Sequence, residues 1–168
     1  MRRSLIIIAL AVLTVACENV TCSIENTVES VYTFYASART DGIFVPGDAI
    51  TVGDTMTVTV LGADSIIANR LVRQKEVRLP VSFYGIVDSL LFEFTDADSR
   101  KGRDTIYVFK QSAPHWEDPS CPVHMFHIVT SLVSTHNIID TVLIINPIIN
   151  YDGLENFRIY FRTSNEEE

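Results

Sequence analysis

The three cysteines are the residues of this chain with the clearest chemistry, and Cys17 differs from the other two in its surroundings. It directly follows an apolar run, residues 5–16, that is preceded by Arg2 and Arg3. A helix needs about 20 apolar residues to cross a bilayer, so this shorter run indicates a cleaved export signal. A signal that ends at a cysteine is typical of bacterial lipoproteins, which are cut before the cysteine so that its thiol carries a diacylglycerol. The pattern therefore predicts lipidation of Cys17.

Two alternatives to a lipidated Cys17 stay open at the level of sequence. Thr14 stands three residues before the cysteine, where such signals usually have leucine. The chain could be cut elsewhere and secreted, or it could keep the apolar run as an uncleaved anchor. Because two or more acyl chains anchor a protein stably where one would not, lipidation would make residues 17–27 a short tether at a membrane.

Cys22 and Cys121 are predicted to form a disulfide, because an exported chain matures where disulfides form and persist. The bond would close a loop of about 100 residues, for which chain entropy gives roughly 4.7 kcal/mol of stabilisation. Two free thiols would result if the two backbones lay too far apart. A metal site would need further ligands, which two isolated cysteines do not supply.

Four histidines supply the imidazoles of the chain: His115, His124, His127 and His136. His124 and His127 are three residues apart, which puts them on opposite faces of a regular strand, so they would not share one metal ion. His115 and Trp116 lie with two carboxylates in the proline-flanked segment 113–122. We interpret this segment as a candidate contact loop with Trp116 as its anchor. The alternative is a long connection in which Trp116 fills the end of the domain.

Charge and motifs argue against nucleic-acid binding and against catalysis. Without residues 1–16 the chain has 11 basic and 21 acidic residues, a net charge of −10, which disfavours partners recognised through phosphate. The sequence has no Gly-x-Ser-x-Gly elbow, glycine-rich phosphate loop or His-Glu-x-x-His pair. Asp96 and Asp98 have the spacing of a calcium loop, but basic residues follow instead of the required glycine and glutamate. We therefore expect no enzyme, no metal and no cofactor.

A triplet of Asp, a hydroxyl residue and an apolar residue occurs five times. In each triplet the Asp side chain could close a turn, and the hydroxyl residue could begin the next strand. The same triplet resembles the acceptor signal of a protein O-glycosylation system in some Gram-negative envelopes, and both interpretations stay open. The candidate acceptors are Thr55, Ser65, Ser89, Thr105 and Thr141.

Apolar and polar residues alternate through much of the chain, which is the period of half-buried β-strands. Segment 55–60, for example, puts Met56 and Val58 on one face and threonines on the other. About eight strands are predicted, at 28–38, 55–60, 77–83, 90–94, 106–109, 123–132, 142–145 and 157–161. The more apolar of them, such as 28–38 and 142–145, are candidates for central or covered strands. Pro80 cannot donate a ladder hydrogen bond, so its strand should lie at an edge or a bulge.

Short strands between turn residues, with no helical period, predict an all-β fold. The architecture that we expect is an antiparallel β-sandwich of about eight strands, with a small β-barrel as the alternative. We place this domain at residues 28–162, after a signal at 1–16 and a lipidated tether at 17–27. Residues 163–168 then form an acidic tail.

Three features together resemble a family of uncharacterised envelope lipoproteins of Gram-negative bacteria, grouped as a domain of unknown function. They are the closely spaced Cys17 and Cys22, segment 109–121 (FKQSAPHWEDPSC), and segment 139–151 (IDTVLIINPIINY) with 157–161 after it. The resemblance implies a lipid-anchored β-domain and brings no activity or catalytic residues with it.

We expect a non-enzymatic protein, anchored to the outer membrane through its N-terminal lipid, that binds another protein. A tether of about ten residues would keep the domain within about 36 Å of that lipid, which favours an integral outer-membrane barrel or its assembly machinery as the partner. The membrane face, periplasmic or cell-surface, stays open. The alternative function is a glycan-binding or adhesive module with an exposed row of aromatic side chains. The side chains to inspect are Tyr32, Tyr84, Tyr107 and Tyr160.

Overall fold

The alternating segments form β-strands in the computed structural model, which describes residues 22, 28–53, 55–95 and 101–162. The predicted signal, Cys17, the Asp96 and Asp98 pair and the acidic tail all lie outside the described residues. Within those ranges no helix is long and apolar enough to cross a membrane.

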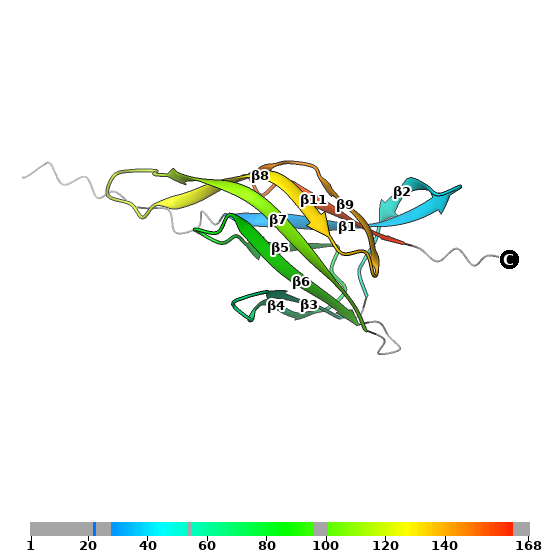
Figure 1. The fold of residues 1–168 in the computed structure, drawn as a ribbon. Helices are drawn as coiled ribbons and strands as arrows, with labels where there is room; N and C mark the ends of the chain where they lie inside the picture. Colours follow the sequence, from blue (N-terminus) through cyan, green and yellow to red (C-terminus); the bar gives the residue numbers. More distant parts are fainter. Residues whose placement is uncertain (1–21, 23–27, 54, 96–100, 163–168) are drawn as a thin grey trace, which may run out of the picture.

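Eleven strands are formed by the described residues. In chain order they are β1 (Glu29–Thr40), β2 (Ile43–Ala49), β3 (Thr55–Val60), β4 (Ser65–Leu71), β5 (Glu76–Pro80), β6 (Val87–Thr95), β7 (Lys101–His115), β8 (His124–Ser134), β9 (Ile139–Ile144), β10 (Ile148–Ile149) and β11 (Glu155–Arg162). One sheet has the order β10-β8-β7-β6-β3-β4, and the other has the order β2-β1-β11-β9 with β5 also paired to β1. The two sheets pack together (Figure 1), which confirms the predicted all-β sandwich.

The strands at the sheet edges are the ones that the sequence pattern describes least well. The pattern does not predict β2, β4 or β10, and each of these strands ends a sheet. β2 is exposed along most of its length and the β3–β4 pairing is broken by register shifts, so neither strand alternates regularly. β9 is also at an edge, although its apolar segment 142–145 makes it a candidate for a central strand. Its Leu143 and Ile144 are exposed instead of covered.

The first and last strands, β1 and β11, run parallel, whereas every other pair of described strands is antiparallel. On its other side β1 pairs with β5 through residues 29–33 and with β2 through residues 35–40. β1 is therefore the central strand of its sheet, and the sandwich contains one parallel pair that alternation alone does not reveal. Pro80 ends β5 on the outer side of this sheet, which agrees with the predicted edge position.

Aromatic side chains from both sheets fill the space between them. Tyr32 and Phe34 of β1, Phe92 of β6 and Phe157 of β11 are all less than 2% exposed. The centroid of the Tyr32 ring lies 4.7 Å from that of Phe157 and 5.6 Å from that of Phe92, so it contacts both sheets. Burying one large apolar side chain stabilises a fold by about 1.5–3 kcal/mol. This aromatic core therefore holds the two sheets together.

Asp104, from one of the recurrent triplets, lies inside β7 and holds a distant turn. Its side chain is buried, and its carboxylate accepts hydrogen bonds from Thr135 and Asn137 and from the backbone N–H groups of Ile138 and Ile139. These residues form the connection between β8 and β9. The prediction that Asp104 closes a turn next to itself is therefore wrong, because its acceptor oxygens serve a turn about 30 residues away.

Two further triplet aspartates also lie within strands. Asp140 of β9 is buried and accepts hydrogen bonds from Arg39 and Arg162. Burial raises the pKa of Asp140, but the hydrogen bonds from its partners outweigh this effect and hold the pKa below the ordinary value. Asp88 lies in β6. Asp64, with a φ of 48°, lies in the turn before β4, and Asp88 accepts a hydrogen bond of 3.4 Å from the backbone N–H of Ser82 in the loop before β6. These two of the four described triplets fit the predicted turn.

Candidate functional site

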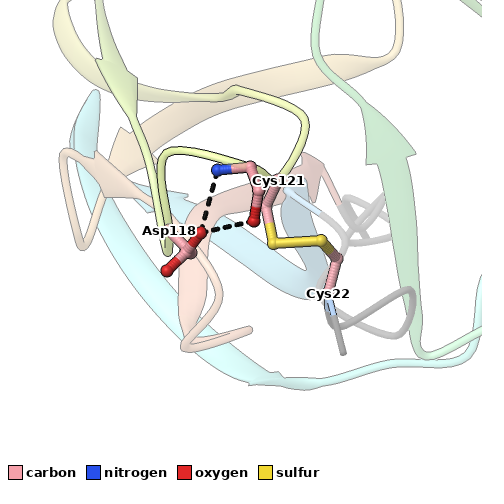
Figure 2. Close-up of a disulfide and its surroundings, with 4 residues drawn as sticks. Cys22, Asp118 and Cys121 are labelled. Carbon is pink, nitrogen blue, oxygen red and sulfur yellow. Dashed lines mark hydrogen bonds between the residues drawn. A yellow bond between two sulfur atoms is a disulfide. The ribbon is translucent and has the colours of Figure 1, made fainter. Parts of the chain in front are cut away.

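Cys22 and Cys121 form a disulfide bond, with their Cα atoms 5.5 Å apart (Figure 2). The backbone N–H of Cys121 donates a hydrogen bond of 3.0 Å to the carbonyl oxygen of Asp118, so Cys121 closes a tight turn. The predicted pairing is thus confirmed. It attaches the N-terminal segment of the chain to the connection between β7 and β8.

This connection lies at the end of a hairpin that extends past its neighbour in the sheet. β6 begins with Val87 opposite Phe109, whereas β7 continues to His115, which pairs with His124 of β8. At about 3.3 Å per residue, the six residues from 109 to 115 extend the hairpin by about 20 Å. We call residues 111–126 the hairpin end. It projects at the end of the molecule opposite β2 (Figure 1).

Four rings gather on the outer face of the hairpin end. His115 stacks on Phe126, with ring centroids 4.2 Å apart and planes 14° apart. Tyr151, from the turn after β10, meets these rings and His124 edge to face at centroid distances of 4.9 to 5.8 Å. We call His115, His124, Phe126 and Tyr151 the hairpin cluster. The alternation of His124 and Phe126 indicates a shared face, but no sequence signal connects Tyr151 to them.

The hydroxyl of Tyr151 is one of the polar groups of the hairpin cluster. It is buried and lies beside the carboxylate of Glu117. Burial raises the pKa of Tyr151, and the negative charge of Glu117 raises it further. The phenol is therefore neutral at physiological pH, and the hairpin cluster offers ring surfaces for contact and no activated nucleophile.

His127 lies on the inner face of the hairpin, opposite His124, as the three-residue spacing predicts. It is 2% exposed, and its Nδ1 lies 2.8 Å from the Oγ of Ser112. Burial, followed by the positive charge of Lys110, lowers the pKa of His127 to about 4. The ring is therefore neutral at physiological pH. Among the described residues no group of three or more His, Cys, Asp or Glu could hold a metal ion.

Lys110, next to His127, fixes the loop between β5 and β6. Its buried Nζ donates hydrogen bonds of 2.7 Å to the carbonyl oxygens of Ser82 and Gly85, and lies 3.7 Å from the carboxylate of Asp88. Burial lowers the pKa of Lys110, while Asp88 acts in the opposite direction. Because acceptors enclose the ammonium group, the geometry assigns this lysine to holding loop 81–86 in place.

The structure separates the two residues of the candidate contact loop. His115 belongs to the hairpin cluster, whereas Trp116 is 57% exposed. The alternative in which Trp116 fills the end of the sandwich is therefore wrong. His136 is exposed near the opposite end of β8. A polar hollow of about 400 Å³, lined by residues of β3, β4, β6 and β7, contains neither His115 nor His136.

The five candidate acceptor hydroxyls differ in accessibility. Ser65 is exposed and begins β4, directly after the turn at Asp64. The other four are half-buried and lie in strands: Thr55, Ser89, Thr105 and Thr141. By accessibility alone, Ser65 is the position most open to a modifying enzyme.

The four tyrosines proposed for a glycan-binding row do not form one. Tyr32 and Tyr160 are 1% and 3% exposed, respectively. Tyr84 is 87% exposed, but it lies in the loop between β5 and β6, and Tyr107 is half-buried on β7. The aromatic row that a glycan-binding module would need is therefore absent from these positions.

Residues 55–161 match a family of unknown function, DUF6452, over more than half of the chain. The chain belongs to this family. The match confirms the expected kind of relationship, an uncharacterised domain family. In this DUF6452 chain the matched region comprises β3 to β11, and β1 and β2 precede it. No curated protein and no solved structure matches the sequence.

Proposed function

We propose that this DUF6452 chain is a non-enzymatic, lipid-anchored protein of the outer membrane that binds a membrane-embedded protein, either an integral barrel or its assembly machinery. The observation that carries this proposal is the disulfide between Cys22 and Cys121. Cys17 lies five residues before Cys22, a reach of at most about 18 Å. A lipid on Cys17 would therefore hold the hairpin end, and not merely the domain as a whole, close to the bilayer.

The outer face of the hairpin has the chemistry of a protein contact surface. Phe109, Ile128 and Ile148 are between 38% and 51% exposed, and Ile128 and Ile148 are direct neighbours across the β8–β10 pair. Exposed apolar side chains grouped on one face are typical of protein–protein contacts. They adjoin the hairpin cluster through Phe126, two positions along β8 from Ile128.

The charges around this face restrict the kind of partner. No Lys or Arg occurs between Lys110 and Arg158, so residues 111–157 give this face no cation with which to attract phosphate groups. The one cation that another strand brings near the hairpin cluster among the contacts described is Arg78 of β5, beside Gly153. A partner surface that is apolar and bordered by basic side chains would complement it better. This argument favours a protein over a nucleic acid.

The test isolates the tagged full-length protein from its native membrane in a mild detergent. Mass spectrometry then identifies the co-purifying proteins and the N-terminal peptide. We expect an acylated Cys17 and one barrel protein or assembly component in a fixed ratio. Ile128→Glu should abolish its recovery, whereas Ile43→Glu, at a position that is 69% exposed in β2, should not.

The outcomes separate the two parts of the proposal. An unmodified Cys17 would exclude the lipid anchor. An acylated protein that keeps the same partner in the Ile128→Glu variant would exclude the outer face of the hairpin as the contact surface. An acylated protein recovered without any partner would favour a glycan-binding role over the accessory role.

A further inference from the structure

Trp116 is the only tryptophan of the chain, and it lies exposed at the tip of the hairpin end. The connection that carries it is restricted by Pro114, Pro119 and Pro122 and by the disulfide at Cys121. A restrained connection loses little conformational entropy when its side chains are buried by a partner. The exposed indole is therefore well placed for contact at low entropic cost.

The disulfide determines how far Trp116 can lie from a lipid on Cys17. Through the tether alone, Val28 could lie about 36 Å from the lipid. Through Cys22 the reach is at most about 18 Å, and Cys121 lies only 5.5 Å beyond Cys22, measured between the Cα atoms. The loop from Trp116 to Cys121 is thus the part of the described domain with the shortest connection to the proposed anchor.

The charges near Trp116 decide which membrane contact is feasible. Glu117 and Asp118 follow it directly, and no basic residue lies in segment 111–157. Segment 111–157 therefore supplies none of the attraction to anionic headgroups that each basic residue would give, about 1 kcal/mol. An aromatic ring at the depth of the headgroups remains, a position in which tryptophan is enriched.

We propose that Trp116 inserts into the headgroup region of a zwitterionic bilayer, so that the hairpin end points toward the membrane. The inference rests on the proposed lipidation of Cys17, because the short reach follows from it. In this orientation the outer face of the hairpin lies next to the bilayer, where a membrane-embedded protein could bind it.

The test uses the full-length acylated protein, reconstituted in phosphatidylcholine vesicles whose acyl chains carry bromine. Bromine quenches tryptophan emission at short range, and Trp116 is the only source of that emission. We expect quenching of about twofold or more, as for a ring at the headgroup level. The matched control carries Trp116→Phe together with Ile43→Trp, which moves the single indole to the opposite end of the sandwich. Its emission should be unchanged.

Adding phosphatidylglycerol to the vesicles should not increase the quenching, because no basic residue flanks the indole.

Unquenched Trp116 in protein that mass spectrometry shows to be acylated would overturn this inference and leave the anchor intact. Equal quenching in the control would overturn it as well, because the domain would then have no fixed orientation. A shift of Trp116 emission only when the membrane protein partner is added would assign the indole to that protein instead of the lipid. Protein without acyl chains would overturn the proposed anchor together with this inference.

Discussion

The carboxylate of Asp104 accepts five hydrogen bonds, three of them from consecutive backbone N–H groups at 137, 138 and 139. Asp104→Ala would leave these donors without their acceptor, at a cost of about 1–3 kcal/mol for each group that stays buried. We expect the free energy of unfolding to fall by about 3 kcal/mol or more in urea denaturation. Asp48→Ala, at an exposed position in β2, should change it by less than about 0.5 kcal/mol. Equal effects of the two variants would contradict the assigned role.

Because the pKa of the buried His127 ring is lowered, we expect the protein to lose stability in mild acid. This pKa is about 4 in the folded protein, near Lys110 of β7 and Asp88 of β6, but about 6.5 in an unfolded chain. Between these values the unfolded state binds more protons, so stability falls as the pH decreases from about 6.5 to about 4. The loss attributable to this ring is up to about 3 kcal/mol.

The measurement for His127 is a series of urea denaturations across that pH range. His127→Gln removes the titrating ring and should flatten this part of the profile, whatever its effect at neutral pH. His136→Gln is the matched control, because His136 is exposed, and its profile should follow that of the unsubstituted protein. A slope that persists in the His127→Gln variant would assign the acid sensitivity to groups other than this ring.

The disulfide at the hairpin end links residues 99 positions apart. Replacing Cys22 and Cys121 together by serine should lower the free energy of unfolding by about 3 kcal/mol, with about 4.7 kcal/mol as the chain-entropy limit. Urea denaturation with and without a reductant measures the loss. The reductant should destabilise the unsubstituted protein and leave the double variant unchanged. If the reductant changed neither protein, the bond would contribute nothing to stability.

At the level of strands and site residues, the sequence predicts what depends on local pattern. The alternation of apolar and polar residues identifies eight strands. The export signal, followed by two remaining cysteines, identifies the disulfide. Each prediction needs information from only a few residues. β2 and β4 do not alternate regularly between buried and exposed residues, and β10 has only two residues, so the sequence pattern does not reveal these strands. The partners of Asp104 and the ring of Tyr151 depend on which strands become neighbours. The parallel β1–β11 pairing depends on the same information, which a single sequence does not contain.

For the whole molecule, the position of β1 raises a question about where the folding unit begins. The family match starts at residue 55, but β1 pairs with β11, β2 and β5. Without β1, β11 would retain only β9 as a neighbour, and β5 would lose its one strand partner in that sheet. Tyr32 and Phe34 would also leave the core. A chain of the matched residues alone would therefore lack the central strand of this sheet and would expose the unpaired edge of β11.

We therefore expect residues 51–162 to lack a cooperative unfolding transition, although they contain the whole matched region. Residues 28–162 with Cys121→Ser, the matched control without the disulfide, should unfold cooperatively in urea and on heating, followed by circular dichroism. The difference arises because removing two core aromatic residues costs about 3–5 kcal/mol each, against a typical domain stability of about 5–15 kcal/mol. A cooperative transition in residues 51–162 would instead make β1 an addition to a family core that folds by itself, and the pairing of β1 with β11 would then be a feature of this chain's extension.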